Sequence, residues 1–97
     1  MQSVCDTNLA EDLATLAWAV AADSHDRDQV NRLVSEAASL IGAAVPSAAQ
    51  VSYHSGRAWL ELGDSAKSAR HFVEAARIDP NGLWGRSARA MTDSIHV

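Results

Sequence analysis

The amino-acid sequence predicts an all-α fold in which about five helices form antiparallel hairpins, stacked as a short solenoid. Apolar residues recur at helical spacing along most of the chain, and β-branched or aromatic residues never alternate with polar ones over several positions. Parts of the chain also match each other when the sequence is shifted against itself by 41 residues. A chain of 97 residues is long enough for one domain, so we expect a single unit over residues 1–97.

The first helix is predicted to begin at Asn8 and to run to about Ala22. Asn8 stands three residues before Glu11, which is the spacing of a capping pair at a helix N-terminus. Apolar positions then step by four, three and four residues, and they are Leu9, Leu13, Leu16 and Val20. A neighbouring stripe of small residues, which would let another helix approach closely, consists of Ala10, Ala14, Ala17 and Ala21.

The second helix is predicted to follow a polar segment, residues 23–28, that interrupts the apolar pattern. Asp26 and Gln29 have the spacing of a capping pair, so the helix is expected to begin there. A broad apolar face follows at helical period. Gly42 weakens the helix and Pro46 ends it, because proline lacks the amide hydrogen that a helix interior needs.

The third helix is predicted to begin within residues 47–50, in the same capping style, and to stop at Gly63. Glycine readily adopts the left-handed conformation that ends many helices. The inward face of this helix is expected to consist of Ala48, Val51, Ser55, Ala58, Trp59 and Leu62.

The fourth and fifth helices are predicted from caps, stops and apolar spacing. Asp64 can cap the fourth helix and Pro80 closes it. The inward face of the fourth helix is expected to consist of Ala69, Phe72, Val73 and Ala76. A fifth helix is expected from about Leu83, with apolar residues at Trp84, Ala88, Met91 and Ile95.

The internal match falls at equivalent points of two helical hairpins. The shift of 41 residues places Ala17-Trp18 on Ala58-Trp59, and Asp23-Ser24 on Asp64-Ser65. Each match covers the end of one helix and the cap of the next. Repeating helix pairs are typical of a solenoid, in which each unit buries its apolar face on its neighbour.

Residues 49–82 closely resemble a tetratricopeptide repeat. Gly56 stands where the first helix of that repeat needs a small residue, and Trp59 takes the aromatic place. The turn, the second helix and its stop are matched by Gly63, Asp64, Phe72, Ala75 and Pro80. Small residues let two helices cross closely while an aromatic ring fills the gap, so the resemblance implies a tightly packed hairpin.

Three serines depart from the repeat pattern. Ser52 and Ser55 stand where the pattern prefers a Trp and a Leu, and Ser68 replaces an alanine. These departures predict looser packing than in a typical repeat. The resemblance divides the chain into a degenerate repeat at about 8–46, a clear repeat at 49–82 and a terminal or capping helix at 83–95.

The net charge of −4 argues against a nucleic-acid partner, because phosphate binding relies on clustered Lys and Arg. Residues 1–48 hold seven acids and two bases, whereas residues 49–97 hold five acids and six bases. This asymmetry favours either ordinary solvated helix faces or head-to-tail pairing of unlike halves. A single Cys5, and no apolar run near the roughly 20 residues that span a bilayer, predict a cytoplasmic protein without a membrane span.

Residue patterns for catalysis or metal binding are nearly absent, so neither an enzyme nor a bound metal or cofactor is predicted. His25 lies among three aspartates, but the segment lacks the glycine and distal glutamate of a calcium loop. His54 and His71 could meet across a hairpin, yet two histidines without a third ligand make a weak zinc site. We expect ordinary polar surface at these positions.

The resemblance implies a binding function for the concave side of the hairpin stack. In the third helix the groove-facing positions are Gln50, Tyr53, Arg57, Leu60 and Glu61. The shift of 41 residues gives the corresponding first-helix set, which is Leu9, Asp12, Leu16, Ala19 and Val20. Such a face suits a peptide or a helix with one charged group and an apolar strip, so a non-catalytic protein or peptide interaction module is predicted. The alternatives for this face are a solvated surface without a dedicated ligand and a surface that the same protein covers.

A second prediction is an oligomerisation or sensing domain of a bacterial transcriptional regulator. The domain is similar to helical-repeat regions that follow helix-turn-helix domains in such regulators, and one lysine against seven arginines indicates a GC-rich bacterial genome. A homodimer would then use the apolar stripe Trp84, Met91 and Ile95 of the fifth helix. Alternatively, this stripe folds back onto Phe72 and Val73 and leaves a monomer.

Overall fold

The predicted all-α class is confirmed in the computed structural model, which describes residues 4–42 and 45–95 of the chain. In these residues all regular secondary structure is helical. The five helices are α1 (Val4–Asp23), α2 (Arg27–Ile41), α3 (Ser47–Glu61), α4 (Ser65–Ile78) and α5 (Leu83–Ile95). They pack as an antiparallel pair α1/α2, an antiparallel pair α3/α4, and a last helix α5 against α4.

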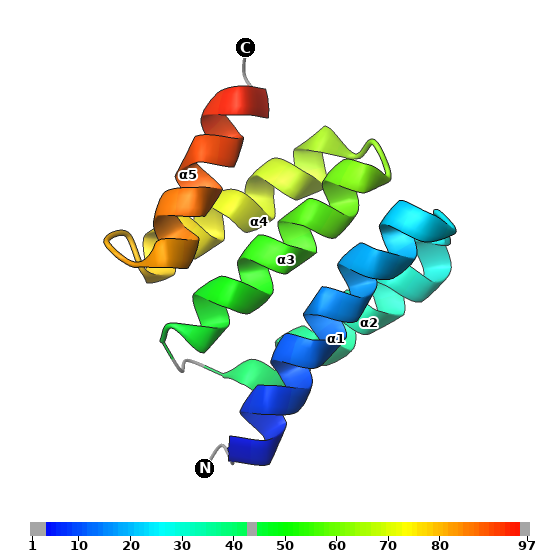
Figure 1. Cartoon of the computed structure of the whole chain (residues 1–97), viewed down its shortest axis with the longest axis horizontal. Helices are drawn as coiled ribbons and strands as arrows, with labels where there is room; N and C mark the ends of the chain where they lie inside the picture. The colour runs from blue at the N-terminus through cyan, green and yellow to red at the C-terminus, as the bar shows by residue number, and fades with distance from the viewer. Residues whose placement is uncertain (1–3, 43–44, 96–97) are drawn as a thin grey trace.

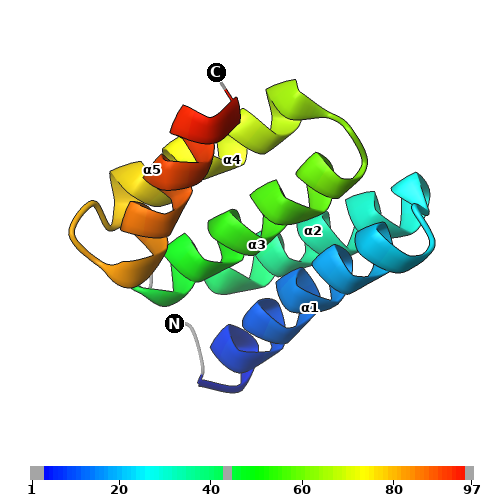
Figure 2. The same ribbon diagram turned by 45° about the horizontal axis from the view of Figure 1, so that its top comes forward.

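The helices form two layers in a flat molecule. α1, α3 and α5 lie side by side in one layer, and α2 and α4 lie behind them in the other (Figures 1 and 2). The Cα atoms extend over 39 × 31 × 16 Å, so the short dimension spans only two layers of helices. The start of α1 and the end of α5 lie at opposite edges of the view in Figure 1.

Two of the predicted caps are confirmed. The Asp26 carboxylate accepts a hydrogen bond from the backbone amide of Gln29 at 3.1 Å, at the start of α2. The Asp64 carboxylate accepts from the backbone amide of Lys67 at 3.1 Å, at the start of α4. Gly63 follows α3 with a φ of 79°, the left-handed conformation expected of it.

The predicted start of the first helix and the predicted cap of the third are wrong, whereas the third helix does begin within residues 47–50. α1 begins at Val4, so Asn8 lies inside the helix and does not cap it. Residues 4–8 contain no Gly or Pro, and nothing local therefore stops the helix from extending towards the N-terminus. α3 begins directly after Pro46, whose position carries no side-chain cap, and Ser47 is its first helical residue.

The alanine stripe of α1 forms its buried face. The four fully buried side chains are Ala10, Ala14, Ala17 and Ala21. They belong to two core clusters to which α2 and α3 also contribute, so α1 lies close to both helices. Leu9 and Leu16, predicted as part of the apolar face of this helix, are 45% and 47% exposed. Small side chains face the core because only they allow two other helices to approach so closely.

Phe72 is fully buried between α3 and α4, as predicted. A Cβ atom added to Gly56 would lie 2.7 Å from the Phe72 ring, so the glycine is needed for this close approach. The hydroxyl of Ser68 donates a 2.8 Å hydrogen bond to the carbonyl oxygen of Gly56, which satisfies the serine in the core. Val73, predicted to face inward, is 56% exposed because the buried residues of α4 lie on a different side of the helix.

Candidate functional site

Aromatic and basic side chains of α1, α3 and α5 meet across the layer that these three helices form. We call this group the α3 aromatic cluster; its members are Trp18, Tyr53, His54, Arg57, Trp84 and Met91. α3 supplies three of them within two helical turns, and α1 and α5 supply the rest from either side. The cluster therefore joins the first helices of the two hairpins to the terminal helix.

His54 is at the centre of the cluster. Its ring stacks on Trp18, with centroids 5.6 Å apart, and meets Trp84 edge-on at 5.1 Å. Its Nδ1 atom lies 3.3 Å from the hydroxyl of Thr15. Burial lowers the pKa of His54 below its usual value, Arg57 lowers it further, and Glu11 opposes the shift. The imidazole is therefore kept neutral in the folded chain at neutral pH.

Tyr53 lies between His54 and the core of the second hairpin. Its ring centroid is 5.6 Å from that of Phe72 and 5.5 Å from that of Trp84. Rings at such separations in tilted arrangements attract each other beyond the burial of their surface. Tyr53 thus connects the α3 aromatic cluster to the buried core around Phe72.

Arg57 has poor hydrogen-bond partners for a guanidinium group. Its carbon Cζ lies over the ring of Trp18 at 4.7 Å, and Nη1 points to the sulfur of Met91 at 3.3 Å. The nearest carboxylate oxygen, that of Glu61, is 3.9 Å from Nη2, which is longer than a hydrogen bond. The Nε atom is buried and has no hydrogen-bond partner among the described residues. A stronger acceptor than a thioether would therefore stabilise this side chain.

The remaining residues predicted to line the groove are more scattered. Gln50 and Leu60 of α3 are half-buried, and Glu61 is exposed. Asp12 and Leu16 of α1 are exposed. At 100° per residue they lie on a different face of α1 from Trp18, the α1 residue that contacts Arg57. The structure therefore brings Tyr53 and Arg57 together, but not with Asp12 or Leu16. The rest of the first-helix set, Leu9, Ala19 and Val20, is exposed or half-buried.

The stripe expected at a dimer interface packs inside the chain. Trp84 contacts Tyr53 and His54, whereas Met91 and Ile95 pack against the core cluster that contains Phe72. All three side chains are half-buried in the single chain. This arrangement agrees with the alternative in which α5 folds back onto the second hairpin, except that Val73 does not take part.

A second concave feature lies between α2 and α4, on the other layer. No Cα atom of α2 comes within 8 Å of a Cα atom of α4, and α3 forms the floor between them. Two adjoining hollows of about 260 and 270 Å³ share Val34, Ala38 and His71. We call this feature the α2/α4 groove. Ser52 and Ser55, which replace the larger residues of the repeat pattern, line it.

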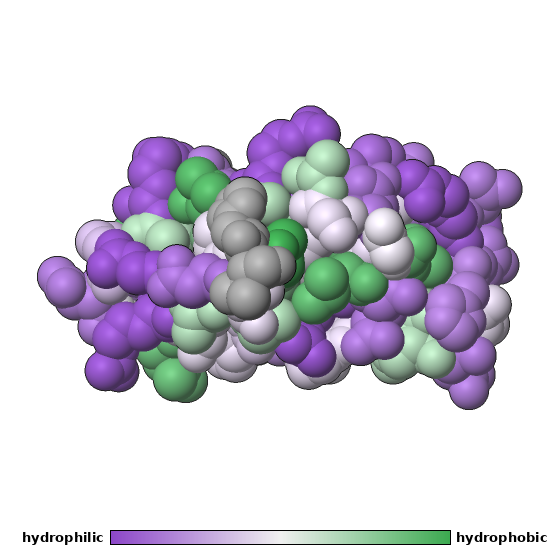
Figure 3. All heavy atoms as spheres, turned by 90° about the horizontal axis from the view of Figure 1, so that it is seen from above, coloured by the Kyte–Doolittle hydropathy of each residue, from purple (hydrophilic) through white to green (hydrophobic). Residues whose placement is uncertain are grey.

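Residues 4–42 and 45–95 provide neither a metal-binding group of side chains nor a helix that could span a membrane. These residues contain no group of three or more His, Cys, Asp or Glu side chains that could hold a metal ion. None of their helices combines the length and apolarity needed to cross a bilayer. On the face in Figure 3, hydrophobic residues form separate patches among hydrophilic ones.

Comparisons with known proteins found no match to this chain among protein-family models, curated proteins or solved structures.

Two members of the cluster, Trp18 and His54, were not predicted as site residues. A signal existed for Trp18, because the internal repeat aligns it with Trp59. The two tryptophans differ in the fold, since Trp59 is 2% exposed and Trp18 is half-buried against Arg57. No spacing rule in the sequence points to His54, which joins the site only through contacts with other helices.

Proposed function

We propose that this chain is a non-catalytic protein or peptide interaction module that binds a carboxylate-bearing segment of its partner at Arg57. The observation that supports the proposal is the coordination of that guanidinium group. Its contacts are a thioether sulfur and a carboxylate oxygen at 3.9 Å, and its Nε atom has no hydrogen-bond partner among the described residues. Planar guanidinium groups bind carboxylates through two parallel hydrogen bonds, so a partner's carboxylate would replace weak contacts by strong ones.

The surroundings of Arg57 favour a peptide as the ligand. Trp18 covers one face of the guanidinium group, and the Arg57 side chain keeps 23% of its surface exposed to a partner. Glu61 is loosely placed and exposed, so it can move away at little cost. The tetratricopeptide-like pattern of residues 49–82 supports the same use of this face.

The cellular context is part of the proposal. We place the protein in the cytoplasm of a bacterium, with a protein partner and without direct contact to nucleic acid or membrane. The second candidate function is an oligomerisation or sensing domain of a transcriptional regulator. It is favoured by one observation, the exposure of Leu9 and Leu16 at the free edge of the first hairpin.

Selection from a displayed peptide library would test the main proposal. We expect the selected peptides to contain Asp, Glu or a free C-terminus, and their affinity to fall when that group is changed to an amide. Arg57→Ala should weaken binding about tenfold to a hundredfold, the usual value of a hydrogen bond to a charged group. Arg57→Lys should retain part of the affinity because it keeps the charge but not the planar fork.

The matched control is Arg89→Ala, which removes an exposed arginine of α5. It should leave peptide affinity unchanged, and circular dichroism should show that both alanine variants are folded. Equal binding by the Arg57→Ala variant and the parent protein would rule out the proposed site. Selection of peptides without any carboxylate preference would do the same.

A further inference from the structure

We propose that two copies of this chain associate by placing the outer face of α1 of one copy in the α2/α4 groove of the other. The outer face of α1 is defined here as Leu9, Asp12, Leu16 and Asp23. This contact uses neither Arg57 nor the rest of the α3 aromatic cluster. The proposed self-association can therefore be tested independently of the proposed peptide site.

The α2/α4 groove is open because the residues that could fill it are small. Ser52 and Ser55 of α3 line its floor, and Ala38 of α2 and Ile78 of α4 stand on its walls. The repeat pattern prefers a Trp and a Leu at the two serine positions, and such side chains would occupy the space between the helices. The result is a groove with an apolar lining, and α2 and α4 do not approach each other closely enough to close it.

The outer face of α1 has the form of a docking helix. Leu9 and Leu16 stand two turns apart and are 45% and 47% exposed, so together they leave an apolar strip of α1 uncovered. Asp12 and Asp23 lie beside them on the same side of the helix and are exposed. Among the described residues neither carboxylate has an ion-pair partner. α1 contains four acidic residues and no Lys or Arg.

The charges of the two surfaces are complementary. Lys67 and Arg70 of α4 line the groove, and the α2 residues that face them are neutral. The one acidic residue of the groove, Glu74, is already paired with Arg77 on its own helix. A positive groove stands out on a chain of net charge −4, and it favours an acidic helix over a basic one.

The apolar part of the outer face of α1 fits within the length of the groove. Lys67 and Ile78, near opposite ends of the groove, are eleven residues apart on α4, or about 16 Å along the helix. Leu9 and Leu16 are seven residues apart, or about 10 Å, so both can lie within the groove. Two copies related by a two-fold axis would make this contact twice. The surface area buried in the dimer would then be twice the area of one contact.

Charge reversal in two separate chains tests the contact. One variant carries Asp12→Lys and Asp23→Lys, and the other carries Arg70→Glu, which replaces an exposed residue without an ion-pair partner among the described ones. Sedimentation equilibrium of the parent protein at high micromolar concentration should give a mass above the 10.3 kDa of one chain. Each variant alone should associate at least about tenfold more weakly. An equimolar mixture of the two should recover part of the association, because the native α1 of one variant then meets the native groove of the other, and the basic α1 meets a groove whose positive charge Arg70→Glu cancels.

The controls are Asp93→Lys and Arg89→Glu, which reverse charges in the same two directions at exposed positions of α5. They should leave association unchanged. A parent protein that sediments as a monomer overturns the proposal. So does an assembly that both groove and α1 variants leave intact, or a mixture of the two variants that fails to associate. Circular dichroism of each variant shows whether the helices are retained, and Leu16→Glu offers an independent way to remove the α1 contact.

Discussion

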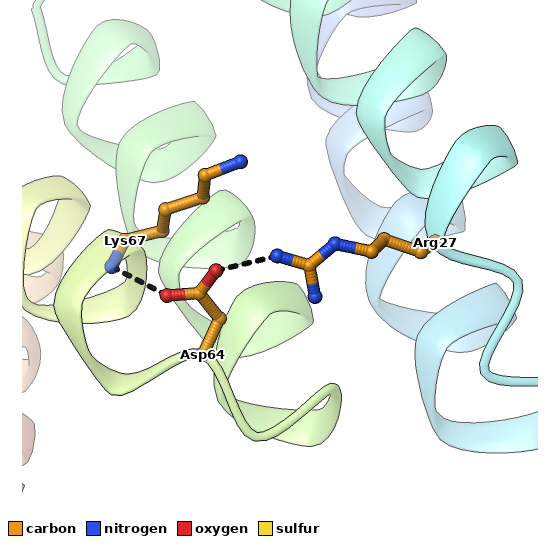
Figure 4. Close-up of polar contacts among 3 residues, drawn as sticks. All are labelled: Arg27, Asp64 and Lys67. Carbon is orange, nitrogen blue, oxygen red and sulfur yellow. Dashed lines mark hydrogen bonds and ion pairs between the residues drawn. The ribbon is translucent and has the colours of Figure 1, made fainter.

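Arg27 and Asp64 form an ion pair between the two helical hairpins, with Nη2 of the arginine 2.7 Å from Oδ2 of the aspartate (Figure 4). Arg27 lies in the first turn of α2, and Asp64 caps α4 through the backbone amide of Lys67. The side-chain cations of Arg27 and Lys67 both lie over the ring of Trp59, at 5.2 and 4.4 Å from its centroid. These contacts tie the hairpins together at one end of the α2/α4 groove.

Removal of Asp64 should destabilise the fold more than removal of Arg27. Asp64→Ala deletes both the cap of α4 and the ion pair, whereas Arg27→Ala deletes the pair and the contact with Trp59 but leaves the cap. Urea denaturation should therefore show a larger loss for Asp64→Ala. Added salt should weaken the effect of Arg27→Ala and leave much of the effect of Asp64→Ala, because a cap depends less on screening. A larger loss for Arg27→Ala would contradict this assignment.

The same pair sets the pH at which this contribution disappears. The backbone amide of Lys67 and the guanidinium of Arg27 lower the pKa of Asp64 below its usual value. The stabilising contribution of the carboxylate is therefore complete above the pKa of the unfolded chain, and it is lost as the pH falls through the lowered value. The difference in stability between the parent and Asp64→Asn should accordingly shrink in acid.

Phe72→Ala should cost about 3 to 5 kcal/mol of unfolding free energy, the usual penalty for emptying an aromatic core position. The side chain is fully buried. Its ring packs against Tyr53 and lies next to Gly56, where no side chain intervenes. Val73→Ala is the matched control, because Val73 lies next in sequence but is 56% exposed. It should change stability by less than about 1 kcal/mol. Chemical denaturation of both variants checks the prediction, and a similar loss in the two would contradict the packing of α4.

Gly56→Ala should destabilise the protein although alanine favours helices by about 1 kcal/mol over glycine. The new methyl group would lie 2.7 Å from the Phe72 ring, and a buried ring has little room to move. We expect a net loss of about 1 to 3 kcal/mol, the usual cost of overpacking. In a background with Phe72→Leu the same substitution should cost less, because the smaller side chain relieves the contact. Urea denaturation of the four proteins measures this coupling, and a stabilised Gly56→Ala variant would exclude the close contact.

Stability should fall as the pH is lowered from about 7.5 to 5, the range in which an ordinary histidine gains a proton. Burial lowers the pKa values of His54 and His71, so both imidazoles resist protonation in the folded state more than in the unfolded chain. Their contribution is complete above the unfolded pKa and is lost as the pH falls through the lowered one. His54→Gln and His71→Gln should each flatten the dependence of unfolding free energy on pH, and the double variant should flatten it most. An unchanged slope in the double variant would contradict the burial of these rings.

Much of the fold could be predicted because its signals are local. A cap such as Asp26 or Asp64 acts on amides three residues away, and Gly63 needs only its own left-handed conformation. Phe72 and Gly56 were predictable from the spacing of the repeat, since a small residue and an aromatic ring at these positions describe one crossing of two helices. The exposure of Val73 was not predictable, because Phe72 and Val73 are adjacent apolar residues of α4 and the helical pattern does not say which of them faces the core.

The candidate sites depended on contacts that no local pattern encodes. By itself the sequence determined the helical class, the position of most helix ends, the burial of Phe72 and the presence of an arginine on α3. Only the tertiary structure decided that alanines of α1, and not Leu9 or Leu16, face the core, that Trp18 and Met91 contact Arg57, and that serines leave a groove between α2 and α4. The physical reason is that helix periodicity fixes which residues share a face, whereas the neighbour that covers the face follows from how closely several helices can pack at once.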